Sequence, residues 1–191
     1  MFVDKTPNWI ENLPDEELYN HEMIQIISFY VLCSPVAGLS AMRKSLGDYN
    51  WNTPWKKPYY LNRQLKQAAS NYCLLYASSS YDLLEDAIQK SETLREFPNN
   101  IEDEAVAFYN CKNNQFMSVF YHIRNSIAHG RFIKKVNNSG EKVYVMEDVV
   151  EQKKNPMQDK LSARMVLYER TLLSWINVIQ NGECRFIPHT Q

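Results

Sequence analysis

The stretch NQFMSVFYHIRNSIAHGRF, from Asn114 to Phe132, carries the clearest structural signal in the chain. Its large apolar residues recur at steps of four, three and four, which is the spacing of one face of an α-helix. These residues are Phe116, Phe120, Ile123 and Ile127. Asn113 or Asn114 suits the cap at the start, and Gly130 fits the position just past the end. The stretch therefore predicts a helix that buries one apolar stripe.

The segments on both sides of this stretch favour helix as well. Pro14 and the acids that follow it suit a helix start, and Pro35 is expected to end or kink that helix. Further helical patterns are expected within 36–47, 59–97, 98–114 and 157–181, and a break of the second into two helices at ASSS, residues 77–80, stays open. Glycine is scarce, with 5 in the chain, which disfavours a turn-rich all-β fold.

The hydrophobic period changes after Gly130. Valines and a phenylalanine alternate around the turn residues Asn137 to Gly140, which predicts a β-hairpin over 131–146. Residues 1–13 show no periodic pattern and are expected to be irregular. The predicted fold is a single domain, residues 1–191, of the all-α class, with a small β-hairpin after the helix of the opening stretch.

Composition limits the classes of protein that fit this chain. Hydrophobic residues make up 45% of its 191 residues, enough for a sizeable core, and the formal net charge is −1. Proteins that bind nucleic acid non-specifically usually carry a basic excess. Any RNA contact is therefore expected to use a local patch.

The sequence favours a cytoplasmic protein. The N-terminus MFVDKTPNWIENLPDEE holds acids where a secretory signal needs a basic start. The apolar stretch from Ile24 to Leu39 contains polar residues and Pro35, so a buried helix is expected there and not a membrane span. The four cysteines form no CxxC pair and are expected to be buried, reduced thiols.

Three polar side chains, Arg124, Asn125 and His129, interrupt the apolar helix near its end. Asn125 and His129 are four apart and share a face, whereas Arg124 and His129 lie about 140° apart around the axis. The guanidinium suits phosphate, and carbonyl dipoles at the helix end favour an imidazolium. A cation, an amide and a titratable imidazole are sufficient for RNA transesterification without a metal.

A structural role is the alternative for these residues. A histidine at a helix terminus is often a cap, and an arginine on a helix often forms a surface ion pair. A related alternative is a helical dimer in which Arg124 and His129 pair with acids across an interface.

The segment IRNSIAHG, from Ile123 to Gly130, resembles the signature of the HEPN superfamily (higher eukaryotes and prokaryotes nucleotide-binding domains). In that signature an arginine is followed, after four to six residues, by a histidine near the end of an apolar helix. Asn125 matches the polar residue that often follows the arginine. The hairpin and the long final helix are similar to a plasmid- and defence-associated branch of the superfamily.

The resemblance implies an HEPN-like helical bundle and a metal-independent endoribonuclease that leaves a 2′,3′-cyclic phosphate, in a toxin or phage-defence context. Arg124 would bind or polarise the scissile phosphate and Asn125 would orient the phosphate or ribose. His129 would be the general acid or base, and an exchange of these roles stays open. No cofactor or metal is implied. A non-catalytic module that binds nucleotide, RNA or protein through the same cleft is the alternative.

The resemblance also implies a homodimer, in which a twofold axis brings Arg124 and His129 of both chains around one cleft. An antitoxin or regulatory protein is a further partner that it suggests. Nothing implies contact with a membrane.

One branch of the superfamily carries a modifiable tyrosine two residues after the histidine. Here that position is Arg131, so control by tyrosine nucleotidylation is not expected. Arg131, Lys134 and Lys135 instead predict a local RNA-binding patch, with solvated hairpin charges as the alternative.

Other candidate residues carry weaker signals. His122 lies on a different face from Arg124 and is expected to be structural or interfacial. One loop holds Trp51 and Trp55 together with Lys56 and Lys57. These residues either stack on bases or anchor the fold or a partner. No metal-binding or phosphate-loop motif occurs in the sequence.

Overall fold

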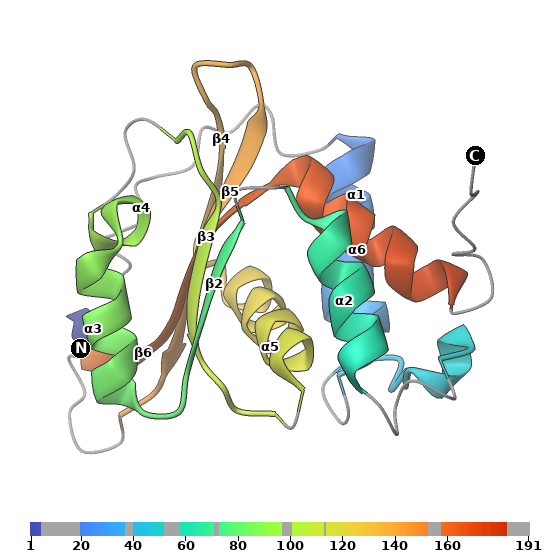
Figure 1. The fold of residues 1–191 in the computed structure, drawn as a ribbon, viewed down its shortest axis with the longest axis horizontal. Helices are drawn as coiled ribbons and strands as arrows, with labels where there is room; N and C mark the ends of the chain where they lie inside the picture. The colour runs from blue at the N-terminus through green and yellow to red at the C-terminus, as the bar shows by residue number, and fades with distance from the viewer. Residues whose placement is uncertain are drawn as a thin grey trace.

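A mixed β-sheet lies at the centre of the molecule, so the prediction of an all-α bundle is wrong (Figure 1). The computed structural model describes residues 1–4, 20–36, 40–51, 58–70, 73–96, 101–112, 114–152 and 158–182. Strands β2-β3-β6-β5-β4 lie side by side in that order, and β1 also pairs with β6. The protein is therefore a mixed α/β fold.

The described strands form one sheet with mainly antiparallel pairing. They are β1 (Phe2–Asp4), β2 (Leu74–Ser78), β3 (Ala105–Tyr109), β4 (Phe132–Val136), β5 (Lys142–Val150) and β6 (Gln158–Tyr168). β2 and β3 run parallel, and the other pairs are antiparallel. β6 is central, because β5 lies along one side of it while β3 and β1 lie along the other. Among the described strands, β2 and β4 end the row of five, and β1 pairs only with β6.

Helices cover both faces of this sheet. They are α1 (His21–Ile27), which continues into the π-helix η1 (Ser28–Cys33), the 3₁₀ helix η2 (Gly47–Tyr49), α2 (Pro58–Ala68), α3 (Tyr81–Lys90), α4 (Glu92–Arg95), α5 (Gln115–Ala128) and α6 (Glu169–Asn181). α3 and α4 lie on one face, and α5 lies on the other with α1, α2 and α6 beyond it (Figure 1). α5 is thus enclosed between the sheet and an outer group of helices.

The predicted helix after Asn114 is confirmed as α5. The Asn114 side chain accepts hydrogen bonds from the backbone N–H groups of Phe116 and Met117, which satisfies two donors left free at the helix start. Gly130 has a φ of 66°, a left-handed conformation that favours glycine just beyond a helix. The predicted apolar stripe is buried along its whole length.

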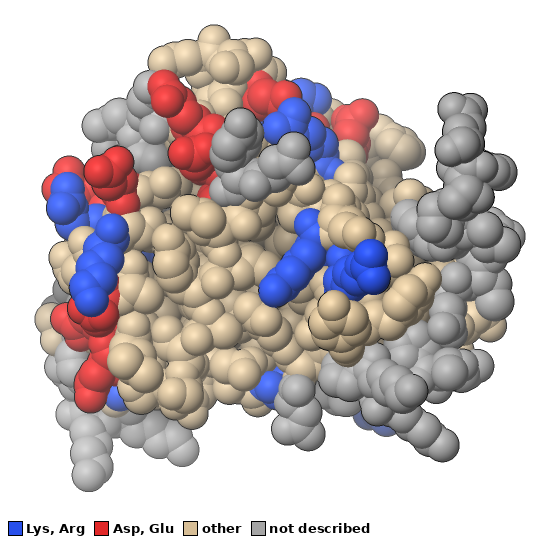
Figure 2. Space-filling model, viewed as in Figure 1, with Lys and Arg blue, Asp and Glu red and all other residues tan. Residues whose placement is uncertain are grey.

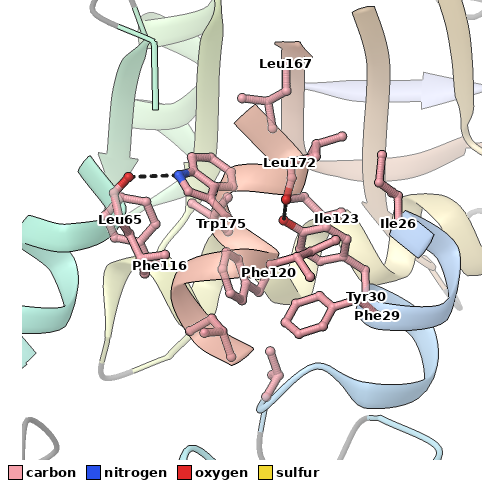
Figure 3. Packing of buried hydrophobic residues seen from close by; sticks show 14 of the residues in the cluster. Ile26, Phe29, Tyr30, Leu65, Phe116, Phe120, Ile123, Leu167, Leu172 and Trp175 are labelled. Atoms are coloured by element: carbon pink, nitrogen blue, oxygen red, sulfur yellow. Dashed lines mark hydrogen bonds between the residues drawn. The ribbon is translucent and has the colours of Figure 1, made fainter. Parts of the chain in front are cut away.

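Aromatic side chains fix α5 against its helical neighbours (Figure 3). Phe116 packs edge-on against Trp175 of α6, with 5.5 Å between the ring centroids. Trp175 Nε1 donates a hydrogen bond to the carbonyl of Leu65 at 2.9 Å, and the Tyr30 hydroxyl donates to the carbonyl of Leu172 at 3.2 Å. The polar atoms of two core aromatics are therefore satisfied by backbone groups of α2 and α6.

A second apolar cluster fills the opposite face of the sheet, under α3 and α4. Its buried residues are Leu84, Ile88, Leu94, Ile101, Ala105, Ala107, Ile133, Val143, Val145, Leu161, Val166 and Tyr168. Because helices cover both faces, most strand positions are apolar and the pattern does not alternate with polar residues.

This two-sided burial explains why the predicted helix over 157–181 is wrong in its first half. Gln158–Tyr168 forms β6, and only Glu169–Asn181 is helical. Leu161, Met165 and Tyr168 recur at steps of four and three, which imitates a helix. A continuous apolar run in a doubly covered strand cannot be distinguished from a buried helix by its period.

Two other strands replace predicted helix. β2 interrupts the helix expected over 59–97, and β3 takes the place of the short helix expected within 98–114. Both strands have five residues, and their parallel pairing joins segments that are far apart in sequence. Local patterns do not report such a pairing. Within 36–47, the described residues form turns and the start of η2 instead of a continuous helix.

The predicted hairpin is present as β4 and β5, but it belongs to the sheet. Asn137 Oδ1 accepts hydrogen bonds from two backbone N–H groups of the turn, and Gly140 has a φ of 79°. β5 extends to Val150, beyond the predicted end at residue 146, and pairs with β6 along most of its length.

The N-terminal segment and the tryptophan loop were predicted in part. Residues 2–4 form β1 and are not irregular, whereas the rest of the predicted irregular segment, 5–13, lies outside the described residues. Trp51 is buried, and its Nε1 donates to the carbonyl of Ile179 at 2.9 Å, so it anchors the fold. The other base-stacking candidates, at 55–57, lie outside the described residues.

Candidate functional site

Arg124, Asn125 and His129 lie on the last turns and the C-cap of α5. Arg124 and Asn125 are half-buried, and His129 is exposed. The backbone N–H of His129 donates to the carbonyl of Asn125 at 3.0 Å, which closes the final helical turn. His129 therefore lies at the tip of the helix, as the sequence predicted.

Asn125 connects the Arg124 guanidinium to the sheet. Arg124 Nη1 donates to Asn125 Oδ1 at 3.0 Å, and Asn125 Nδ2 donates to Asp148 Oδ2 at 3.4 Å. A side-chain amide carries both an acceptor and a donor, so it can bridge a cation and a carboxylate that do not touch. The position of the guanidinium is thus set by β5 through a single side chain.

Arg124 retains unused hydrogen-bonding capacity. Its Nε is buried and has no hydrogen-bond partner within the described part of the chain, and none of the ion pairs there includes this guanidinium. A buried donor without a partner costs free energy, and the guanidinium fork matches the oxygens of a phosphate. An anion beside Arg124 would satisfy that donor.

Arg124 and His129 are not joined within one chain. No hydrogen bond links their side chains among the described residues, and five helical positions separate them by about 140° around the axis. The side chains that the structure does bring together are Arg124, Asn125 and Asp148.

Asp148 is the centre of a buried polar cluster between α5 and the sheet. It is 2% exposed, and its Oδ2 accepts hydrogen bonds from His122 Nδ1 at 2.6 Å and Ser162 Oγ at 3.0 Å, in addition to the one from Asn125. One carboxylate oxygen therefore holds side chains from α5 and β6 together.

A β-bulge lies at this cluster. Asp148 is paired with Ala163 and Val149 with Leu161, so Ser162 is the extra residue on β6. Bulges re-aim side chains and occur often beside functional sites. Here the bulge coincides with the serine hydroxyl that contacts the carboxylate.

The surroundings of His122 favour its imidazolium form. Its Nδ1 faces Asp148, and its Nε2 lies 2.8 Å from the carbonyl of Tyr109, so both ring nitrogens face acceptors and both carry hydrogen. Burial of the ring opposes the charge, but the hydrogen bonds to Asp148 and Cys111, the Asp148 charge and the Tyr109 carbonyl outweigh it and raise the pKa of His122 to about 9. The sequence prediction of a structural role for His122 agrees with this geometry.

Arg131, predicted to contact RNA, is instead a buried structural residue. It is 6% exposed, and its Nη2 pairs with Glu147 at 2.9 Å. Arg164 of β6 pairs with the same carboxylate at 3.3 Å and also donates to the carbonyls of Leu94 and Arg95 at the end of α4. This cluster ties β5 and β6 to the helices on the α3 face.

Lys134 is likewise held by an internal partner. Its Nζ pairs with Glu169 at 3.0 Å, and the side chain is 6% exposed. Lys135 is half-buried on the same strand. The predicted RNA-binding patch at 131–135 is therefore not an open cluster of three cations.

Metal ligands and membrane spans are both lacking in the described ranges. No group of three or more His, Cys, Asp or Glu side chains there is arranged to hold a metal ion. No helix in those ranges is long and apolar enough to cross a bilayer.

Cys33 and Cys73 are half-buried free thiols and Cys111 is exposed, so the expectation of buried cysteines is wrong for these three. Cys184 lies outside the described residues.

Comparisons of the chain with protein-family models, with curated proteins and with solved structures find no match. The resemblance to the HEPN superfamily therefore rests on the segment from Ile123 to Gly130, and the helical bundle that it implied is contradicted by the sheet. Any functional proposal has to rest on the chemistry of the residues themselves.

Sequence reasoning missed the groups that position the site. Asp148 lies on β5 beyond the end of the predicted hairpin, and Ser162 lies on β6, which was predicted as helix. The sequence did contain one signal for these groups, which is a single acid and a single serine within otherwise apolar runs. Polar residues that interrupt a buried strand need hydrogen-bond partners. That signal indicates a polar cluster but does not identify its members.

Proposed function

We propose that this protein is a metal-independent endoribonuclease in which Arg124 and His129 act on one scissile phosphate. The observation that carries this proposal is the environment of Arg124. Asn125 positions its guanidinium, and its buried Nε has no hydrogen-bond partner among the described residues. An RNA phosphate would satisfy this donor, and the half-buried site would strengthen the interaction.

The proposed reaction is an intramolecular transesterification of RNA. The ribose 2′-oxygen attacks phosphorus, the bond from phosphorus to the 5′-oxygen breaks, and a 2′,3′-cyclic phosphate and a 5′-hydroxyl end result. One group removes the proton of the 2′-hydroxyl, and another protonates the departing 5′-oxygen. The exposed imidazole of His129 exchanges one of these protons, and Arg124 stabilises the charge on the non-bridging oxygens.

Asn125 has a positioning role in this scheme. It joins Arg124 to Asp148, which is itself fixed by His122 and Ser162. A preorganised cation stabilises developing charge without reorganising at the moment of reaction. The buried cluster therefore supports the proposed site without touching the substrate.

The active form proposed is a homodimer. Within one chain the spacing of five positions directs Arg124 and His129 away from each other. A twofold axis close to the end of α5 would bring Arg124 of one protomer near His129 of its partner, and each phosphate would then contact both chains.

The proposal is tested by incubating purified protein with RNA in EDTA. We expect cleavage, and products whose 3′ ends accept poly(A) only after treatment with T4 polynucleotide kinase, as a cyclic phosphate requires. Arg124→Ala and His129→Ala are each expected to reduce the rate by about 100-fold or more. Arg95→Ala and His21→Ala, which remove exposed residues elsewhere, serve as controls and should retain the parental rate.

Two results would contradict the assignment. One is undiminished cleavage by folded Arg124→Ala or His129→Ala protein. The other is RNA binding by the parent protein that depends on Arg124 but is followed by no cleavage. That second result would support the alternative of a binding module, because the unsatisfied guanidinium also suits phosphate binding alone.

A further inference from the structure

β2 is an edge strand whose outer backbone groups have no partner within the described residues. Its N–H and carbonyl groups at Leu74 and Ser78 face β3, because Leu74 donates to Glu104 and Ser78 accepts from Asn110. Residues of a strand alternate in direction, so the backbone groups of the residues between them at 75 and 77 face the free edge. This spacing is what an added strand requires.

A groove runs between this edge and helix α2. Its volume is about 720 Å³, and its walls include Tyr59, Arg63 and Lys66 of α2 and Leu74 and Leu75 of β2. The free edge of β2 at Leu75 therefore faces a space that is large enough for part of an extended chain.

The groove carries positive charge. Arg63 and Lys66 have no ion-pair partner within the described part of the chain, and the groove lining contains no acid. Figure 2 shows a largely uncharged surface over β2, with Lys and Arg side chains over α2. The neighbouring residues thus favour an acidic occupant.

The strand next to the groove also exposes apolar side chains. Leu74 is 53% exposed and Tyr76 is 37% exposed. An exposed apolar edge strand promotes aggregation unless it is covered or paired. A strand added beside β2 would pair its free backbone groups and extend cover over these side chains.

We propose that this groove binds an extended acidic segment of a partner protein, which adds to β2 as a sixth member of the β2-β3-β6-β5-β4 row. Side chains alternate along a strand, so acidic residues at every second position would face Arg63 and Lys66. The residues between them would be apolar and would lie on the side of Tyr76. The site uses different residues from Arg124 and His129, and its test requires no RNA cleavage.

A second copy of this chain fits the groove less well. Pairing of two β2 edges would bring two sets of Arg63 and Lys66 close together, and like charges repel. Single-stranded RNA would match the cations but would leave the backbone groups of Leu75 and Ala77 without strand partners.

The test uses a capped heptapeptide that alternates glutamate and valine, with binding measured by fluorescence anisotropy on the full chain. We expect saturable binding that is weakened about tenfold or more when lysine replaces glutamate, or when the alternate backbone N–H groups that face β2 are methylated. The double variant Arg63→Glu with Lys66→Glu should lose affinity to the same extent. The control variant Lys90→Glu with Arg95→Glu makes the same charge change on the opposite helical layer, and it should retain the parental affinity for the peptide.

Ala77→Pro separates strand addition from charge attraction. It removes an N–H at the free edge without removing a hydrogen bond to β3, which edge strands tolerate. We expect this variant to weaken the peptide by about tenfold. The proposal would be overturned if the N-methylated peptide bound as tightly as the unmethylated one, or if single-stranded RNA competed as well as the acidic peptide does. Either result would indicate a general anion site. Failure of the acidic peptide to bind would overturn the proposal as well.

Discussion

At the scale of single residues, the His122–Asp148 pair joins helix α5 to strand β5. Both groups are almost completely buried, and Nδ1 lies 2.6 Å from Oδ2. A buried charge without its partner is strongly destabilising, although an intact buried pair adds little net stability compared with apolar packing. The pair joins α5 to β5, and its carboxylate is also the one that Asn125 contacts.

The raised pKa of His122 predicts how stability depends on pH. The ordinary pKa is 6.5 and the folded value is about 9, so the folded state binds this proton more tightly than the unfolded state does. The stabilisation is fully present below about pH 6.5 and is lost as pH rises through about 9. Urea unfolding measured from pH 6 to 9.5 should show this decline.

His122→Gln provides the control for this pH dependence. The variant leaves the Asp148 charge uncompensated, so we expect its free energy of unfolding to fall by about 3 kcal/mol or more near neutral pH. The decline between pH 6.5 and 9 should then be smaller than in the parent protein. Identical pH profiles for the two proteins would show that His122 is not the group responsible.

The placement of the candidate site residues was predictable to the extent that local sequence determines it. Arg124, Asn125 and His129 follow from a helix whose caps and apolar stripe are all close in sequence. The burial and pairing of Arg131 do not follow from local sequence, because strand pairing brings its partner Glu147 to it. In the sequence alone, a cation close to Arg124 and His129 suggests a contact with phosphate, whereas in the fold Arg131 pairs with an internal acid.

At the scale of elements, the Arg131–Glu147–Arg164 cluster joins strands to the helical layer on the α3 face. Glu147 is fully buried and pairs with both guanidinium groups. Glu147→Gln would remove the negative charge with which both buried guanidinium groups pair. We expect a loss of about 3–5 kcal/mol in the free energy of unfolding, measured by chemical denaturation.

Glu141→Gln is a matched control for this change. Glu141 pairs with Arg170 at 2.6 Å, but this pair lies at the surface, with side chains that are 36% and 55% exposed. Surface ion pairs contribute about 0–1 kcal/mol, so the variant should unfold nearly as the parent protein does. Equal effects of the two substitutions would mean that the buried cluster does not hold the elements together.

Helix α5 and the hairpin were predictable, whereas β2, β3 and β6 were not. The first two are specified by signals within them, such as the Asn114 cap and the turn at Gly140. The strands are short or apolar on both faces, and their pairing depends on segments far away in sequence. Their identity as strands comes from tertiary contacts that a local pattern does not contain.

At the scale of the whole molecule, α5 lies between the sheet and the outer helices, and its C-terminal end is exposed to solvent. This arrangement places Arg124 on a rigid element and His129 at its exposed tip. It also leaves two surfaces for partners: the end of α5, proposed to face a second copy, and the β2 edge, proposed to take an acidic segment. Different residues serve the two surfaces, so separate variants can test each one.

The composite site is tested most directly by mixing the inactive Arg124→Ala and His129→Ala proteins, under conditions that allow dimers to exchange. A mixed dimer retains Arg124 on one protomer and His129 on the other. We predict that RNA cleavage in EDTA reappears, at up to about a quarter of the parental rate, because random exchange makes half of the dimers mixed and each mixed dimer retains one of its two Arg124–His129 pairs. A mixture of folded, exchanging dimers that remains inactive, while the parent protein cleaves RNA, would contradict a site shared between two chains.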